Sequence, residues 1–242
     1  LIWGCVFCAI AALCIFLSSN YDREKRRYLI LMESFASLLL LMDAMVYIFN
    51  GYPGVPGSVM VRISSFLVFL LSDVVLLCFH IYVCVYLFSK RERRTLKRVK
   101  AGYVIAAAGA VFVVISQFTH WYYYIDVDNY YHRAPLYIMS ILFSAAGLLI
   151  DLTLLLQYKK RVSRKLLFSM LSCIVLPAVA AAVQAFWYGI SLIEFSVGIS
   201  MIIMFIVTMT ELNQEMYELI SREGKIKERL EIATILNKCI AE

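Results

Sequence analysis

The chain has 242 residues, of which 62% are hydrophobic and 17% are charged, and its mean hydropathy is +0.80. A soluble domain of this size does not need so much apolar sequence, so we expect a polytopic membrane protein. The net charge of +6 fits basic loops between membrane spans and does not indicate nucleic-acid binding. The chain begins at Leu1 and stops within a helical pattern at Glu242, so we expect a piece of a longer protein.

Hydrophobic runs close to the length of about 20 residues that crosses a bilayer as a helix predict seven transmembrane helices. These runs cover residues 1–18, 28–49, 60–88, 102–119, 136–157, 166–186 and 191–210. The predicted fold is all-α, with a seven-helix transmembrane domain at residues 1–210 and a cytoplasmic stalk helix at residues 211–242.

The charge of the loops predicts the orientation of the chain in the membrane. The loops after the first, third and fifth predicted spans hold 16 of the 23 Lys and Arg residues, whereas the alternate loops hold only Arg62 and Arg133. Because basic loops stay in the cytoplasm, we expect the N-terminus outside and the C-terminal helix inside a cell that carries this protein in its plasma membrane.

Two loops on the predicted outer side differ in composition. Residues 51–57 are rich in Gly and Pro, which predicts a tight turn. Residues 120–133 combine Trp and Tyr residues with Asp126 and Asp128. These aromatic residues indicate either a belt at the membrane interface or a lid over a pocket.

Polar side chains recur at one depth on five predicted spans. Counting at about 1.5 Å per residue from the cytoplasmic ends places them about 22–28 Å up, in the outer third of a hydrocarbon core about 30 Å thick. Ionisable groups inside spans are candidates for function. We expect a ligand pocket open to the outside; the alternatives are separate hydrogen bonds between helices, or a position in the headgroup region for Glu194. The candidate pocket residues, including two tryptophans, are Asp43, Asp73, Gln117, Trp121, Gln184, Trp187 and Glu194.

A second polar pair is expected nearer the cytoplasm. His80 and Asp151 count to about 10–15 Å above the inner boundary on the third and fifth predicted spans. Such a pair is either a structural clasp or a proton-linked switch. Glu33 lies near the inner end of the second predicted span, and we expect it to pair with a basic loop residue.

From about Met209 onward the chain becomes a charged helix with a heptad pattern. Apolar residues occupy every d position and several a positions, a pattern typical of a two-stranded coiled coil, although a solvated amphipathic tail is the alternative. Asn237 at an a position would fix the register of the two strands. The residues that we expect in the seam of a parallel homodimer are Leu212, Leu219, Ile226, Leu230 and Asn237.

Catalytic and cofactor motifs are missing from the sequence. The last predicted span has no Lys for a retinal Schiff base, and only His80 among the three His residues lies within a span, which is too few for an intramembrane zinc site. The Cys residues, mostly within apolar runs, are expected to be small hydrophobic residues buried in the membrane domain. We therefore expect no enzymatic activity, no cofactor and no metal in this chain.

The segments from Glu211 to Met216 and from Lys227 to Glu242 resemble the stalks of bacterial multi-span sensors. The chain resembles the N-terminal seven-span sensor modules of membrane signalling proteins in Gram-positive bacteria. The resemblance implies a cytoplasmic output domain after residue 242, such as a GGDEF diguanylate cyclase or a histidine kinase. We expect a sensor of an extracellular or intramembrane cue, with an unknown small ligand; the alternative is a small transporter.

Overall fold

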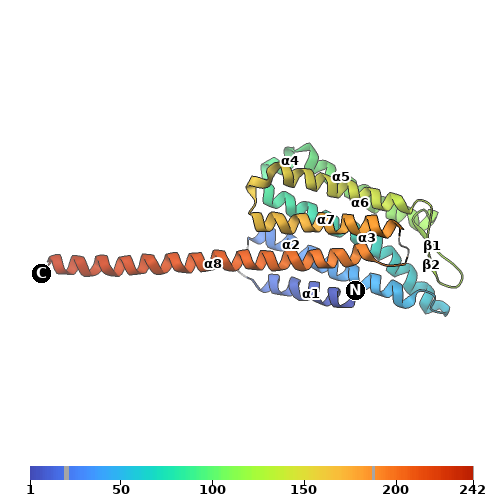
Figure 1. The fold of residues 1–242 in the computed structure, drawn as a ribbon, viewed down its shortest axis with the longest axis horizontal. Coiled ribbons are helices and arrows are strands. Elements are labelled where there is room, and N and C mark those ends of the chain that lie inside the picture. Colours follow the sequence, from blue (N-terminus) through green and yellow to red (C-terminus); the bar gives the residue numbers. More distant parts are fainter. Residues whose placement is uncertain (19–21, 187–188, 242) are drawn as a thin grey trace.

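The computed structural model describes residues 1–18, 22–186 and 189–241, and almost all of this chain is helical (Figure 1). Two short strands, β1 at Tyr123–Ile125 and β2 at Tyr131–Arg133, form an antiparallel hairpin, and a 3-10 turn, η1, covers Lys159–Arg161. The α-helices are α1 (Ile2–Leu17), α2 (Arg23–Phe49), α3 (Gly54–Leu87), α4 (Lys90–Thr95), α5 (Lys97–Thr119), α6 (Tyr137–Tyr158), α7 (Arg164–Phe186) and α8 (Leu192–Ala241).

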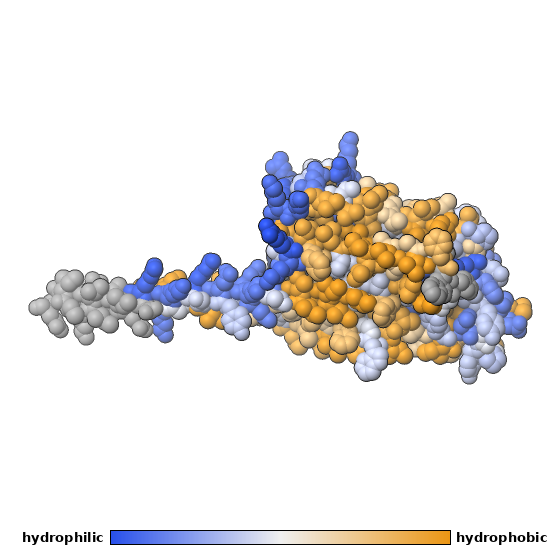
Figure 2. Space-filling model, in the orientation of Figure 1, coloured by the Kyte–Doolittle hydropathy of each residue, from blue (hydrophilic) through white to orange (hydrophobic). Residues whose placement is uncertain are grey.

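Six described helices, α2, α3, α5, α6, α7 and α8, are long and apolar enough to cross a membrane. The protein is therefore a multi-pass membrane protein, and Figure 2 shows the broad hydrophobic surface of its bundle. The predicted first span also forms a helix, but α1 has only 16 residues. That length is short of the roughly 20 residues that span a bilayer.

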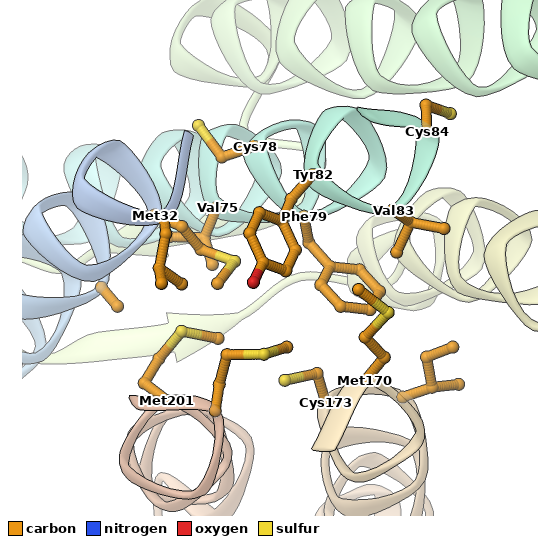
Figure 3. Close-up of a cluster of buried hydrophobic side chains, with 14 of the residues drawn as sticks. Met32, Val75, Cys78, Phe79, Tyr82, Val83, Cys84, Met170, Cys173 and Met201 are labelled. Atoms are coloured by element: carbon orange, nitrogen blue, oxygen red, sulfur yellow. The ribbon is translucent and has the colours of Figure 1, made fainter. Parts of the chain in front are cut away.

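The helices form a closed bundle in which α3 contacts α2, α5 and α6, while α8 contacts α1, α2 and α7. The core between α2, α3, α7 and α8 combines aliphatic side chains with aromatic and sulfur-containing ones (Figure 3). Phe79 and Tyr82 of α3 point toward Met170 of α7 and Met201 of α8. Many apolar side chains outside this core, such as Leu149 and Phe168, are exposed, as expected of a surface that faces lipid.

The turn predicted at residues 51–57 is shorter than expected. Gly51 and Gly54 adopt the positive φ angles that glycine allows, but α3 already begins at Gly54. Pro56 lies in the first turn of α3, where its missing N–H leaves no helical hydrogen bond unmade. The Gly- and Pro-rich composition therefore predicted the turn correctly, but the helix was predicted to begin at residue 60 and begins at Gly54.

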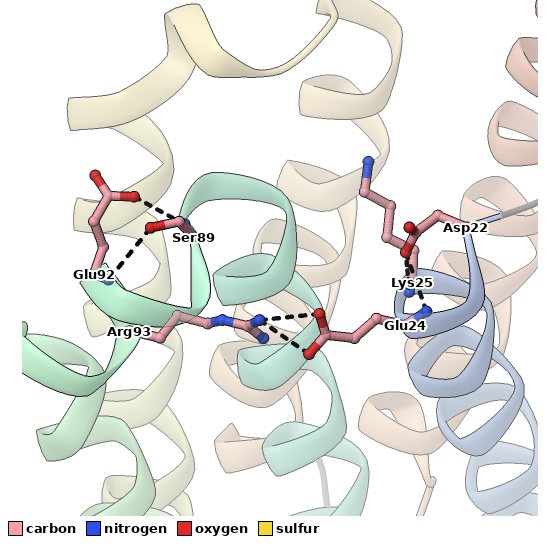
Figure 4. A network of polar contacts seen from close by, with 6 residues as sticks. All are labelled: Asp22, Glu24, Lys25, Ser89, Glu92 and Arg93. Carbon is pink, nitrogen blue, oxygen red and sulfur yellow. Dashed lines mark hydrogen bonds and ion pairs between the residues drawn. The ribbon is translucent and has the colours of Figure 1, made fainter.

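Ion pairs connect the basic loops at the end of the bundle from which α8 emerges. Arg93 of α4 donates two hydrogen bonds, of 2.9 and 3.0 Å, to the carboxylate of Glu24 in α2 (Figure 4). Ser89 and Glu92 form a capping box at the start of α4, and Arg161 reaches Glu92 at 3.2 Å. The amide of Ser89 and the guanidinium of Arg161 lower the pKa of Glu92 below its ordinary value.

The hairpin covers the opposite end of the bundle, where it joins α5 to α6 (Figure 1). Asn129, in its turn, has a φ of 64° and donates hydrogen bonds to the carbonyl groups of Tyr52 and Gly54, at 2.9 and 3.3 Å. The amide of Tyr131 donates to Asn50 at 2.8 Å. The hairpin is thereby attached to the turn between α2 and α3.

Candidate functional site

A cavity of about 450 Å³ lies beneath the hairpin. Its size is within the range of small-molecule sites in proteins. Three of the predicted pocket residues line it, together with residues of the hairpin and of the segment before α8. The residues that contribute polar groups to the lining include Asp43, Ser65, Asp126, His132, Arg133, Gln184, Ser191 and Glu194.

Asp43 connects α2 to the segment that leads into α8. Its Oδ1 atom accepts a 3.0 Å hydrogen bond from the hydroxyl of Ser191, while its Oδ2 atom is buried without a hydrogen-bond partner among the described residues. Tyr47, one helical turn along, donates to the carbonyl of Gly189 at 3.1 Å. Two residues of α2 therefore fix the backbone just before α8 begins.

Glu194 lies in the first turn of α8 and lines the same cavity as Asp43. It is 9% exposed, and its Oε2 atom has no hydrogen-bond partner in the described part of the chain. An acidic side chain is favourable in the first helical turn because the N-terminal end of a helix carries a partial positive charge. The cavity therefore contains two carboxyl groups that each keep a free acceptor oxygen.

Gln184 and Arg133 position the ends of α7 and α8. The Oε1 atom of Gln184 accepts a 2.9 Å hydrogen bond from the amide of Ile193, which satisfies one of the free N–H groups at the start of α8. Arg133 donates to the carbonyl of Gln184 at 3.3 Å, and its guanidinium lies 4.5 Å from the centre of the Tyr137 ring. The cationic group of Arg133 is thus held by the protein at the edge of the cavity.

Asp126 and His132 are joined by a hydrogen bond within the hairpin, with 2.8 Å between Oδ2 and Nε2. The Oδ1 atom of Asp126 also accepts hydrogen bonds from the amides of Asp128 and Tyr130, at 3.0 and 2.8 Å. The hydrogen bond from His132 is the main cause that lowers the pKa of Asp126. This carboxylate is therefore used to shape the loop that covers the cavity.

A second cavity, of about 480 Å³, adjoins the first and extends toward the middle of the bundle. The two cavities share Phe69, Ser72, Tyr137 and Glu194 as lining residues. The second cavity is largely apolar, with aliphatic and aromatic side chains from α3, α5, α6, α7 and α8. Asp73 of α3 is its other acidic lining residue.

Asp73 packs against the backbone of α5. A Cβ atom added to Gly109 would lie 3.0 Å from Oδ2 of Asp73, so glycine at this position lets the two helices approach. Tyr122, the hairpin residue that lines this cavity, is 1% exposed, and its hydroxyl has no hydrogen-bond partner among the described residues. Burial raises the pKa of the Tyr122 hydroxyl to about 12.

The structure thus brings four of the predicted pocket residues to the two adjoining cavities, namely Asp43, Gln184 and Glu194 at the first and Asp73 at the second. Gln117 and Trp121 line neither cavity. The amide of Gln117 instead accepts from the Tyr123 hydroxyl and donates to the carbonyl of Val113. Trp121 is exposed beside Phe112, and Trp187 lies outside the described residues.

His80 and Asp151 meet as predicted, on the side of the bundle where α3, α5 and α6 adjoin. The distance from Nδ1 of His80 to Oδ1 of Asp151 is 2.6 Å, and Nε2 lies 3.0 Å from the carbonyl oxygen of Val99. The Val99 oxygen can only accept, so Nε2 carries a proton, and a second proton lies between Nδ1 and Oδ1. A Cβ atom on Gly102 would lie 2.3 Å from the His80 ring, so α5 leaves room for the pair only with glycine there.

The prediction that Glu33 pairs with a basic loop residue is wrong. Glu33 is fully buried, and its carboxyl group lies beside the thiol of Cys8 in α1. Its helix face also carries Leu29, Met32 and Ala36, which are buried in the core. The side chain is therefore directed into the bundle and away from the loops.

The stalk residues differ in their surroundings. Leu212 is 7% exposed and lies inside its own bundle, near the contacts of Glu211 with Ser163 and of Gln214 with Lys165. Leu219, Ile226 and Leu230 lie farther along α8, and their side chains are 60%, 58% and 63% exposed. The side chain of Asn237 is outside the described part of the structure.

Comparisons with known proteins identified no relative of this chain. No protein-family model matches it, and no curated protein and no solved structure is detectably similar to it. The features from which a function can be inferred are therefore the two cavities, the His80–Asp151 pair and the course of α8.

Proposed function

We propose that this chain is the sensory and transmission module of a membrane signalling protein, with the cue recognised at the cavity beneath the hairpin. The observation that carries the proposal is the continuity of α8, which is one helix of 50 residues from Leu192 to Ala241. At 1.5 Å per residue it is about 75 Å long. Glu194 in its first turn lines both cavities, and its last turns project beyond the bundle (Figure 1).

The topology that we propose has seven spans, with α1 as the first crossing despite its length. The described structure supports the orientation, because the basic segments around Arg93 and Arg161 lie at the end of the bundle from which the stalk emerges (Figure 1). The hairpin, which carries Asp126 and Asp128, lies at the other end. By the positive-inside rule the stalk is then cytoplasmic and the hairpin extracellular.

The stalk would act as a parallel homodimer through the exposed heptad positions. Leu219, Ile226 and Leu230 are large exposed apolar side chains on the part of α8 that projects from the bundle, where Tyr217 and Ile220 are exposed as well. Burying such side chains against a second copy would stabilise the dimer by about 1.5–3 kcal/mol each. Because α8 is unbroken, a shift or rotation at Glu194 would reach the seam without crossing a hinge.

The proposal is tested by changing the phase of α8 below the bundle. In a chimera that joins residue 242 to a cytoplasmic diguanylate cyclase domain, one residue inserted after Glu215 rotates the stalk by about 100° relative to the bundle. Seven inserted residues roughly preserve the phase of the seam. We expect the single insertion to lock or abolish cyclase activity and the heptad insertion to leave it near the parent level. Equal activity in both chimeras would show that the stalk is a passive tether.

A further inference from the structure

The two adjoining cavities differ in character. The outer one, beneath the hairpin, has carboxyl groups in its wall, and the inner one is lined mostly by hydrocarbon. They meet at Phe69, Ser72, Tyr137 and Glu194. One elongated ligand could therefore place a polar head in the outer cavity and a chain in the inner one.

Several hydroxyl groups in these walls are already used as hydrogen-bond donors, whereas two carboxyl groups keep unsatisfied oxygens. The hydroxyl groups of Ser72, Ser140 and Ser144 already donate to backbone carbonyls of their own helices. Asp43 and Glu194 are 4% and 9% exposed, and each has a buried oxygen without a partner among the described residues. Buried carboxyl oxygens without hydrogen-bond partners are costly, and a ligand that brings hydrogen-bond donors or a positive charge would satisfy them.

The basic groups at the outer cavity are already engaged. His132 is paired with Asp126 at 2.8 Å, and Arg133 is held by the Tyr137 ring and the carbonyl of Gln184. A primary ammonium group supplies one positive charge and three N–H donors, which matches acceptors that converge from α2 and α8.

Several residues that line the inner cavity are among the exposed residues of α6 and α7. Its lining includes Ile138 and Leu149 of α6, which are 50% and 61% exposed, and the exposed residues Ala178 and Ala182 of α7. Residues that line a cavity and are also exposed on the outside of a membrane bundle mark a route from the bilayer. A molecule dissolved in the membrane could therefore enter between α6 and α7.

We propose that the ligand is an amphiphile with a primary amine head and a single apolar chain. The head binds between Asp43 and Glu194, and the chain lies in the inner cavity with its end near the gap between α6 and α7. This inference deepens the proposed sensor function, on which it rests, by naming the class of molecule that the outer site recognises.

The test uses a long-chain alkylamine that carries a photoreactive diazirine at the end of its chain. The full chain is embedded in nanodiscs of zwitterionic lipid, the probe is photolysed, and labelled peptides are identified by mass spectrometry. Two control probes have the same chain, one with a sulfate head and one with a trimethylammonium head that has no N–H donor. We expect the amine to label residues 137–158 and 164–186 at least about 10-fold more than the sulfate, with the trimethylammonium probe between them.

Matched variants decide whether the carboxyl groups hold the head. The double substitution Asp43→Asn with Glu194→Gln should lower labelling by the amine about 10-fold or more. Glu33→Gln, which changes a buried acid outside both cavities, should leave it unchanged. The thermal midpoints of all variants show whether they remain folded; if the double variant unfolds, each single substitution is used instead.

Equal labelling by the amine and the sulfate would overturn the proposal and identify the inner cavity as a site for lipid chains only. Unchanged labelling in the folded Asp43 and Glu194 variants would overturn it as well. These outcomes are separate from a failure of the sensor proposal, because labelling requires neither a dimer nor an output domain. If the chain binds the amine but the two insertion chimeras have equal activity, the protein binds the amphiphile but does not transmit a signal through α8.

Discussion

The hydroxyl of Ser191 donates a 3.0 Å hydrogen bond to Oδ1 of Asp43, and this bond joins α2 to the residues immediately before α8. Three residues later Glu194 lines the same cavity as Asp43. A ligand that binds either carboxyl group would therefore act on the first turn of α8, through Glu194 itself or through the Ser191–Asp43 hydrogen bond. Because α8 continues as the stalk, the geometry offers a direct mechanical route from the outer cavity to the cytoplasm.

The first prediction concerns the close approach of α3 and α5. In Gly102→Ala the new Cβ would lie 2.3 Å from the ring of His80, so the ring or the helix must move. Overpacking of this kind costs about 1–3 kcal/mol, and the thermal midpoint of the purified chain should fall. Gly224→Ala is the matched control, because nothing lies within 4 Å of its added Cβ and alanine favours the helix by about 1 kcal/mol. Equal midpoints for the two variants would contradict the packing described here.

The second prediction separates the two partners of the buried pair. Asp151→Asn can still donate to Nδ1 of His80 while Nε2–H donates to Val99, so this variant should lose less than about 1 kcal/mol. His80→Leu leaves the carboxyl of Asp151 and the carbonyl of Val99 without their partner, and each unsatisfied buried group should cost about 1–3 kcal/mol. Thermal unfolding of both variants measures the difference. If Asp151→Asn were as damaging as His80→Leu, the pair would have to be an imidazolium–carboxylate ion pair.

The third prediction concerns the pH dependence of the hairpin. The folded pKa of Asp126 lies below its ordinary value near 3.9, so its contribution to the loop is complete above about pH 4. That contribution is lost as the pH falls through the lower, folded pKa. Protection of the Asp128 and Tyr130 amides from hydrogen exchange, corrected for the intrinsic exchange rates, should therefore decrease in acid. Asp126→Asn keeps an acceptor oxygen without titrating, and the same acid dependence in that variant would refute the assignment.

The fourth prediction concerns orientation. In intact cells, a membrane-impermeant maleimide should label Asp128→Cys in the hairpin turn and should not label Lys97→Cys or Lys160→Cys in the basic segments. All three variants should be labelled after the membrane is permeabilised, which controls for exposure of the thiol. Labelling of the basic segments from outside would reverse the proposed topology.

Depth along a helix could be predicted from the sequence, whereas the direction of a side chain around the helix could not. Counting from the cytoplasmic ends placed Asp43 and Glu194 at one height, and the structure shows them at one cavity. Gln117 has a similar depth, but its amide contacts Tyr123 and the backbone of its own helix. The similar heights of His80 and Asp151 likewise predicted a pair. The two side chains meet because α3 and α6 are in contact.

Contacts made by loops and by the backbone were missed. The strands of the hairpin have three residues each, which is too short for an alternating pattern to be recognised. Asp126 and Asn129 are the residues that could have indicated its turn, because Asp and Asn favour such positions. Arg133 lies in the hairpin and Ser191 at the first residue of the last predicted span, so counting depth along the spans did not assign either of them to the site.

The central claim is that α8 carries a signal through a parallel dimeric seam, and disulfide cross-linking in membranes tests the seam most directly. In a Cys239→Ser background, single cysteines at Leu219, Ile226 and Leu230 should form dimers rapidly on mild oxidation. Cysteines at Ser221 and Lys225, which the heptad pattern places on the outer face of the same helix, should cross-link far more slowly. Uniform cross-linking at all five positions, or none at Leu219, Ile226 and Leu230, would contradict the account.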